Sequence, residues 1–213
     1  MGTYNKGILG PFSGKVGTVV GAKWRGKDVM RSLPKKTDRP PSDLQLIQQG
    51  KFTFVSKFLN PISPVTSRYF GFDTGAQTRR NQAMSYHIKD AVNFVAPDYE
   101  ILFNKVLISK GDMLGVQNPT ASSPGIRQLQ LTWDDNSGQG TASATDNLVV
   151  VLYAPDSDLY YLNLQAANRE ELSVVIDLPE YFQGVLVQGW ITFVAANEKS
   201  YATSNYIGSL TIQ

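Results

Sequence analysis

The second half of the sequence alternates between apolar runs and turns, and this pattern restricts the possible folds more than any other feature. From Tyr99 onward there are seven short β-type runs: YEILFNKVLIS, RQLQLTW, NLVVVLYAP, LYYLNL, ELSVVIDLP, GVLVQGWITFVAA and NYIGSLTIQ. Turn-rich segments such as DDNSGQG and NEKS separate them. In RQLQLTW, Leu129, Leu131 and Trp133 alternate with polar residues, so they share one face of a strand. Seven strands with this turn spacing predict an immunoglobulin-like or fibronectin-like β-sandwich.

The absence of cysteine narrows this choice. The chain has no Cys, so it lacks the Cys…Trp…Cys signature of immunoglobulin domains, and we favour the fibronectin-like form. Trp133 and Trp190 are then expected in the cores of opposing sheets. Tyr181 and Phe182 lie in a turn between predicted strands, where they form either a contact site or part of the core.

The first 41 residues are rich in glycine and basic residues. KVGTVVGAKW and KDVMRSLP are predicted to be two strands of a hairpin joined at Arg25 and Gly26. LPKKTDRPPS follows as a connector, because its prolines cannot continue a strand ladder.

Helical periodicity dominates between the connector and Pro97. Ser42 and Gln45 form a capping box that starts one helix, and AQTRRNQAMSYHIKDAVNFVAPD predicts a second helix that ends at Pro97. PISPVTSRYFGF, which contains two prolines, interrupts the pattern between them. We therefore predict a mainly β protein: a β-hairpin plus two-helix module at residues 1–97, and a seven-stranded fibronectin/immunoglobulin-like sandwich at residues 98–213.

The charges are distributed unevenly. Residues 1–40 contain nine Lys and Arg residues against two Asp residues, a net charge of +7. The remaining residues contain eleven basic and sixteen acidic side chains, a net charge of −5. This asymmetry suits head-to-tail contact between copies, and it suits nucleic-acid binding equally well. The predicted interaction residues are Lys15, Lys23, Trp24, Arg25, Lys27, Arg31, Lys35, Lys36 and Arg39.

The N-terminal glycines do not form a phosphate-binding loop. A P-loop has four residues between its first Gly and its Gly-Lys pair, and a Ser or Thr after that pair. Here only three residues separate Gly10 from Gly14-Lys15, and Val16 follows. Nucleic-acid binding is the more serious alternative, because Trp24 lies among cations. On an alternating strand, however, Trp24 faces away from Lys23 and Arg25, which favours a role as a core anchor.

The composition argues against an enzyme. No Cys is available as a nucleophile, and the single histidine, His87, lies on the predicted inner side of its helix and is expected to be a packed core residue. The acidic pairs Asp134-Asp135, Asp156 with Asp158, and Glu170-Glu171 are expected in solvated turns, since DDNSG lacks the ligand spacing of a calcium loop. We expect no catalytic residue, no metal site, no cofactor and no small-molecule substrate.

No apolar run is long enough for a secretion signal or a membrane span. We expect cytoplasmic synthesis without a signal peptide and no membrane span, which is compatible with incorporation into a virion or an extracellular particle.

The N-terminal segment carries a resemblance to a known family. GILGPFSGKVGTVVGAKWRGKDVMRSLP, followed by PSDLQLIQQGKFTFVSKFLNPI, resembles an uncharacterised domain family abundant in Bacteroidota. The matching positions are Phe12, Ser13, Gly14, Lys15, Val16, Gly17, Val19, Val20, Gly21, Trp24, Gly26, Arg31 and Gln45. The resemblance spans the chain but implies no activity.

These features together favour a non-enzymatic structural or interaction protein that acts by self-association or docking. A component of a phage-like or other self-assembling particle fits this description, because virion proteins often join an extended arm to an immunoglobulin-like domain. The partners would be further copies or other particle subunits. Two alternatives stay open: a nucleic-acid-binding protein that uses the basic N-terminal segment, and a carbohydrate-binding or surface-binding sandwich.

Overall fold

A computed structural model describes residues 3–4, 10–24, 26–35, 39–75 and 77–213. The chain forms two compact units, Met1–Leu46 and Ile47–Gln213. The second unit includes most of α1 (Asp43–Leu59), the other helices and the sandwich, while the domain boundary predicted at residue 97 stays a prediction.

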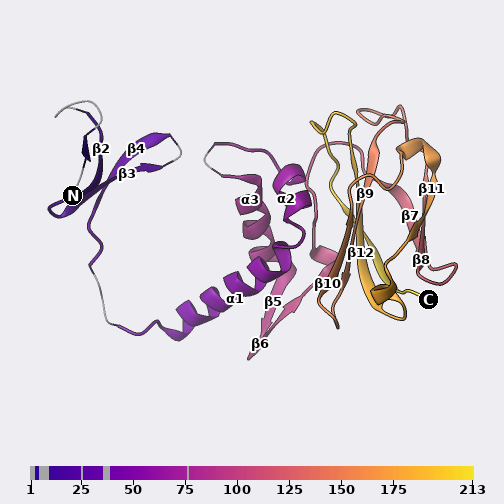
Figure 1. Cartoon of the computed structure of the whole chain (residues 1–213), viewed down its shortest axis with the longest axis horizontal. Helices are drawn as coiled ribbons and strands as arrows, with labels where there is room; N and C mark the ends of the chain where they lie inside the picture. The colour runs from indigo at the N-terminus through magenta and orange to yellow at the C-terminus, as the bar shows by residue number, and fades with distance from the viewer. Residues whose placement is uncertain (1–2, 5–9, 25, 36–38, 76) are drawn as a thin grey trace. The chain divides into compact units, whose positions relative to one another are not determined.

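The first unit contains a four-stranded antiparallel sheet in the order β1-β2-β3-β4 (Figure 1). Its strands are β1 (Thr3–Tyr4), β2 (Phe12–Val16), β3 (Val19–Trp24) and β4 (Lys27–Ser32). The predicted hairpin is confirmed, because Trp24 pairs with Lys27 at the end of the β3–β4 ladder. Its first strand is shorter than predicted, since Lys15 and Val16 belong to β2 and a turn at Gly17 and Thr18 precedes β3. Gly17 and Gly26 have positive φ angles of 59° and 78° at the two tight turns, a conformation that favours glycine.

The helices of the second unit differ in part from the prediction. They are α1 (Asp43–Leu59), α2 (Ser63–Tyr69), α3 (Arg79–Tyr86) and the π-helical turn η1 (His87–Ala91). The capping box is confirmed: the Ser42 backbone N donates to Gln45 Oε1 (3.0 Å), and the Gln45 backbone N donates to Ser42 Oγ (3.4 Å).

Two helix predictions need correction. The segment thought to interrupt the helices forms α2, because Pro64 lies in its first turn, where a helix needs no backbone N–H donor. The helix predicted to reach Pro97 ends earlier and gives way to the hairpin β5 (Val92–Val95) and β6 (Asp98–Ile101).

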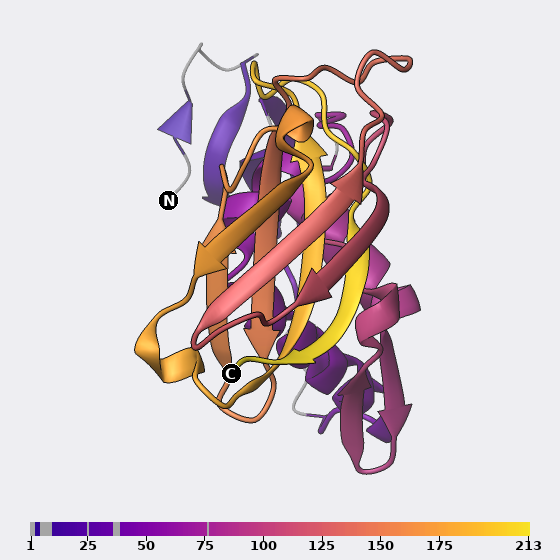
Figure 2. The same cartoon turned by 90° about the vertical axis from the view of Figure 1, so that its right-hand side faces the viewer.

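The rest of the second unit is the predicted fibronectin-like sandwich. A four-stranded sheet has the order β10-β9-β12-β13, and a three-stranded sheet has the order β11-β8-β7 (Figure 2). The strands are β7 (Gln117–Ser122), β8 (Gln128–Asp134), β9 (Asn147–Ala154), β10 (Leu159–Asn163), β11 (Ser173–Asp177), β12 (Leu186–Val194) and β13 (Asn205–Thr211). Short 3-10 turns are η2 (Phe103–Lys105), η3 (Arg169–Glu171) and η4 (Glu180–Phe182).

The first sandwich strand is not the one predicted. YEILFNKVLIS supplies part of β6, η2 and the buried residues Val106 and Ile108, while the strand itself is the polar β7. Asn118 and Pro119 conceal β7 in the sequence, because both residue types are uncommon in strands. They are tolerated here because the β7–β8 ladder is irregular between Gln117 and Thr120.

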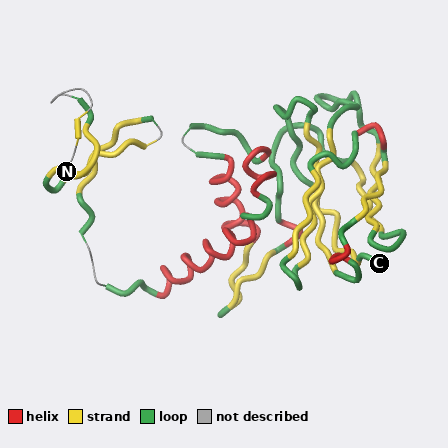
Figure 3. Tube along the Cα trace, viewed as in Figure 1, coloured by secondary structure: helices red, strands yellow, loops and turns green. Residues whose placement is uncertain are grey.

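The four-stranded sheet is covered on both faces, as the layers in Figure 3 show. Toward the three-stranded sheet, its side chains form the sandwich interior with Trp133. Toward the helices, Val149, Val151 and Trp190 pack against α1 residues Phe58 and Leu59. Both predicted core tryptophans are buried on opposing sheets, but Trp190 points out of the sandwich into the helical layer.

A buried ion pair between Arg169 and Asp146 lies at one end of the sandwich. The Arg169 guanidinium is fully buried and donates through Nε to Asp146 Oδ2 (3.0 Å) and through Nη2 to the Leu114 carbonyl (2.9 Å). It also bonds to Asn136 Oδ1 and lies 3.9 Å from the centroid of the Phe193 ring. Each buried charge therefore has a partner, which the low local dielectric makes necessary.

We expect Arg169→Ala to destabilise the second unit by about 3–5 kcal/mol, because it leaves the Asp146 carboxylate buried without its cation. Urea denaturation followed by circular dichroism measures this loss. Lys105→Ala, which removes an exposed cation, is the matched control. A loss for Arg169→Ala no larger than that of the control contradicts the role assigned to the pair.

Candidate functional site

The register of the N-terminal sheet separates its side chains into two chemically different faces. Residues directly opposite each other in an antiparallel pair share a face. Arg31 is opposite Val20, and Lys27 is opposite Trp24. The basic face is therefore formed by Lys15, Val20, Ala22, Trp24, Lys27, Val29 and Arg31. The neutral face carries Phe12, Val16, Val19, Gly21, Lys23, Asp28 and Met30, in which Lys23 is opposite Asp28.

This arrangement corrects the prediction for Trp24. Its side chain is 55% exposed instead of being a core anchor. It does face away from Lys23, as predicted, but it shares its face with Lys15, Lys27 and Arg31. The sheet thus places one aromatic ring and three cations on one surface.

The remaining predicted interaction residues lie elsewhere. Lys35 and Arg39 are exposed in the connector after β4, and Arg25 and Lys36 lie outside the described residues. That any of these residues binds a partner stays a prediction.

The N-terminal sheet has almost no core of its own. In the parts of residues 3–46 that the structure describes, Gly21 is the one buried residue. A side chain at Gly21 would collide with the backbone and ring of Phe12, so the two strands approach closely there. Val16, Val29 and Met30 are 43%, 38% and 69% exposed. The described strands of the first unit therefore pair through their backbones, but apolar side chains on both faces of the sheet stay exposed.

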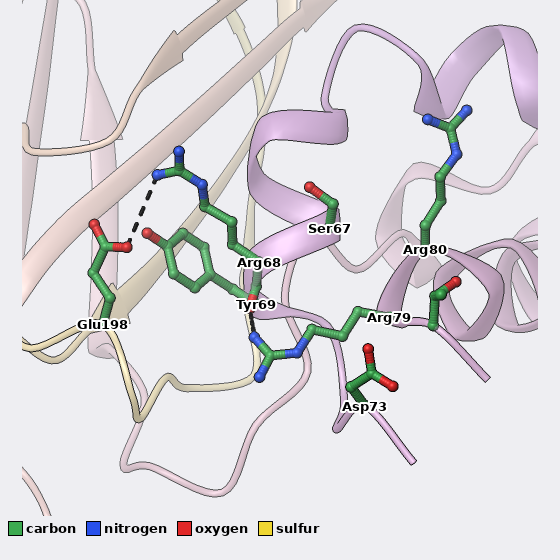
Figure 4. Close-up of a pocket in the computed structure, with 8 residues that line it drawn as sticks. Ser67, Arg68, Tyr69, Asp73, Arg79, Arg80 and Glu198 are labelled. Atoms are coloured by element: carbon green, nitrogen blue, oxygen red, sulfur yellow. Dashed lines mark hydrogen bonds and ion pairs between the residues drawn. The ribbon is translucent and has the colours of Figure 1, made fainter. Parts of the chain in front are cut away.

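A polar hollow of about 590 Å³ in the second unit lies between α2, the start of α3 and Glu198 (Figure 4). Its three arginines already have partners within the protein. Arg68 lies 3.9 Å from Glu198, and Arg79 bonds to the Arg68 carbonyl and lies over the Tyr201 ring. Arg80 bonds to Asn60 and Ser63. These contacts join the helices to each other and to the sandwich, which is a structural role.

His87 is packed in the core, as predicted. It is 1% exposed, and its Nδ1 donates to the Ala83 carbonyl (2.8 Å), while Nε2 has no hydrogen-bond partner among the described residues. The rings of Phe58, Phe70 and Tyr86 surround it. Burial lowers the pKa of His87, because the apolar surroundings disfavour the charged imidazolium.

The acidic pairs have structural partners as well. Asp135 accepts from the Ser137 backbone N (2.9 Å), and the hydrogen bonds from Ser137 lower its pKa. Asp158 lies 3.0 Å from Lys57, and Glu171 closes a capping box at the start of η3. Within the described residues, no group of acidic or histidine side chains is arranged to hold a metal ion. No helix in this part of the chain is both long and apolar enough to cross a membrane.

The turn carrying two neighbouring aromatics is divided between surface and core. Tyr181 is 56% exposed, whereas Phe182 is fully buried in the sandwich interior. A contact role for this turn would rest on Tyr181 alone.

Comparison with known families agrees with the sequence resemblance. Residues 11–208 match the model of a family of unknown function, DUF6266. The chain belongs to this family. The match includes the Gly-rich strands, the helices and most of the sandwich, so both units are family features. No curated protein matches the chain in sequence.

One solved structure with a similar fold is a fibronectin type III domain of the human collagen alpha-1(XX) chain. It is 15% identical, the alignment covers 49% of this chain and 89% of that domain, and the TM-score is 0.34.

Acid should weaken the second unit through His87. The folded-state pKa lies below the unfolded value of about 6.5, so between that value and the folded pKa the unfolded chain binds the proton and the folded chain does not. We expect the free energy of unfolding to fall by up to about 1.4 kcal/mol per pH unit below pH 6.5. Urea titrations between pH 7 and pH 5 measure this, and His87→Gln should flatten the slope. An unchanged slope in His87→Gln would assign the acid sensitivity to other groups.

Proposed function

We propose that this protein is a non-enzymatic structural or interaction protein whose N-terminal sheet docks on a neighbouring subunit. One observation carries the proposal: the strands of the four-stranded sheet pair through their backbones, but among the described residues of the first unit Gly21 alone is buried. A sheet needs a second layer against its apolar surface for stability. The exposed Val29 and Met30 side chains are therefore suited to burial against another surface.

Charge and connector support docking between copies. Residues 1–40 carry +7 and the rest of the chain carries −5, so one copy can attract the opposite part of another. Pro34, Pro40 and Pro41 lie in the connector, and proline-rich segments favour extended, semi-rigid conformations. Such a connector is suited to presenting the sheet to a neighbour.

The more specific proposal is a subunit of a phage-like or other self-assembling particle. An arm joined to a fibronectin-like sandwich is a common design for such subunits, and each copy here has both a basic and an acidic part. Negative-stain microscopy of concentrated protein tests it: regular rings, tubes or shells are expected, and only isolated particles of monomer size would contradict it.

We expect the full chain to associate at low salt in a concentration-dependent manner. The variant Lys15→Glu/Lys27→Glu/Arg31→Glu should stay monomeric, because it reverses the basic face without touching a buried side chain. Sedimentation velocity at low and high ionic strength measures both effects.

The matched control is Lys89→Glu/Lys105→Glu/Lys199→Glu, which makes the same change in net charge at exposed positions of the second unit. It should associate more strongly than the basic-face variant. A wild-type chain that stays monomeric at every concentration and salt level would refute the proposed function.

Nucleic-acid binding is a second candidate, and the position of Trp24 favours it. The ring shares the basic face with Lys15, Lys27 and Arg31, an arrangement typical of single-strand binders, which combine stacking rings with cations. We expect any such binding to weaken steeply with salt and to be lost in both Trp24→Ala and the basic-face variant. Fluorescence anisotropy with a labelled single-stranded oligonucleotide measures it. No binding at low salt eliminates this candidate.

A further inference from the structure

The negative charge of the second unit is concentrated in its sandwich. Residues 47–112, which include most of α1 and the other helices, contain eight basic and five acidic residues, a net charge of +3. Residues 113–213 contain three basic and ten acidic residues, a net charge of −7. One of those three cations, Arg169, is buried and paired with Asp146. The net charge of −7 on residues 113–213 thus equals in size the net charge of +7 on residues 1–40.

The two sheets of the sandwich differ in what covers their outer faces. The helices pack on the four-stranded sheet, whereas the three-stranded sheet presents its outer face in Figure 2 with no described element of the second unit over it. We call this outer face the acceptor face. It is formed by Thr120, Ser122, Gln128, Gln130, Thr132, Asp134, Ser173, Val175 and Asp177.

The acceptor face has acidic ends and one exposed apolar side chain near its middle. Val175 is 51% exposed and pairs with Gln130 near the centre. Asp177 pairs with Gln128 at one end of the ladder, and Asp134 is at the opposite end of β8. None of the described side chains on this face is basic. Four further acidic residues border it in the adjoining segments: Asp135, Glu170, Glu171 and Glu180.

The basic face of the N-terminal sheet has the complementary pattern. On β4, Lys27 and Arg31 flank Val29, which is 38% exposed. Their Cα atoms are four residues apart, about 13 Å along a strand. The acidic ends of the acceptor face are six residue steps apart, from Gln128 to Asp134, which is about 20 Å along the strand. Flexible Lys and Arg side chains can span the difference between the two distances.

We propose that the acceptor face of one copy binds the basic face of the N-terminal sheet of a second copy. In this contact Val29 packs near Val175, while Lys27 and Arg31 meet the carboxylates of Asp134 and Asp177. The three-stranded sheet of one copy then covers the N-terminal sheet of the other as its second layer. Two sheets packed face to face in this way are the usual arrangement of a sandwich. This inference rests on the proposed function and names the surface that the docking uses.

A second copy fits this site better than the same chain. Residues 47–59 of α1, where the chain enters the second unit, lie in the helical layer on the opposite side of the sandwich from the acceptor face. A chain folding back on itself would have to pass two packed layers, each about 10 Å thick, before reaching its own acceptor face.

Disulfide trapping tests the contact directly, because the chain has no natural cysteine. One preparation carries Val29→Cys and a second carries Val175→Cys, and the two are mixed and oxidised. We expect a covalent heterodimer in several-fold excess over the controls. One control replaces Val29→Cys by Met30→Cys, which lies next to it on β4 but on the neutral face. The other replaces Val175→Cys by Lys89→Cys in the helical layer.

A charge exchange gives an independent measurement. Lys27→Glu/Arg31→Glu should weaken association roughly tenfold, the effect of losing about 1.4 kcal/mol of charge pairing. Asp134→Lys/Asp177→Lys should do the same. A mixture of these two variants should associate again, since the reversed basic face of one matches the reversed acceptor face of the other.

The outcomes separate the site from the proposed function. Salt-sensitive association without Val29–Val175 trapping and without recovery in the charge exchange overturns the acceptor face and leaves the proposed function standing. A monomeric chain under all conditions refutes both. A Val29→Cys/Val175→Cys chain that closes its disulfide within a monomer at high dilution overturns the second copy as occupant.

Discussion

Burial of the four-stranded sandwich sheet on both faces is the constraint on which the second unit depends. Alternate residues of β9 and β12 point into the sandwich interior and into the helical layer, so both cores share the same two strands. Ile191 and Trp190 are neighbours in sequence but belong to different cores, and both are fully buried. A helix that leaves this sheet would expose Val149, Val151 and Trp190 to water. For this reason most of the helical residues belong to the same compact unit as the sandwich, although they precede it in the sequence.

The sequence predicted elements whose signals are local. Gly26 marked the hairpin, Ser42 and Gln45 marked the start of α1, and strong alternation marked β8. It failed where tertiary contacts override local preference. The polar β7 is a strand because β8 pairs with it, and the apolar run from Tyr99 to Ser109 is divided between a hairpin, a 3-10 turn and buried segments under the sheet. The near-continuous apolar runs of β9 and β12 do indicate that a further layer covers the sheet, because a strand buried on both faces has no polar alternation.

The candidate interaction surface was predictable in composition but not in geometry. Counting charges located the basic segment, and alternation within β3 separated Lys23 from Trp24. Which cations share the Trp24 face depends on how β2 and β4 pair with β3, and a shift of one residue in either register would reverse the result. That no described element of the second unit covers the outer face of the three-stranded sheet depends in turn on the helices packing against the other sheet. Both surfaces are consequences of pairing and layering, which single residues do not encode.

The three tryptophans are distributed so that each one reports on a different layer of the protein. Trp24 is exposed on the N-terminal sheet, Trp133 lies in the sandwich interior 6.0 Å from the Phe193 ring centroid, and Trp190 lies between the sheet and the helices. Indole fluorescence shifts with the polarity around the ring, so the three emissions start from three distinct environments. Versions of the chain that keep a single indole would follow, by spectroscopy, the N-terminal sheet, the sandwich and the helical layer one at a time.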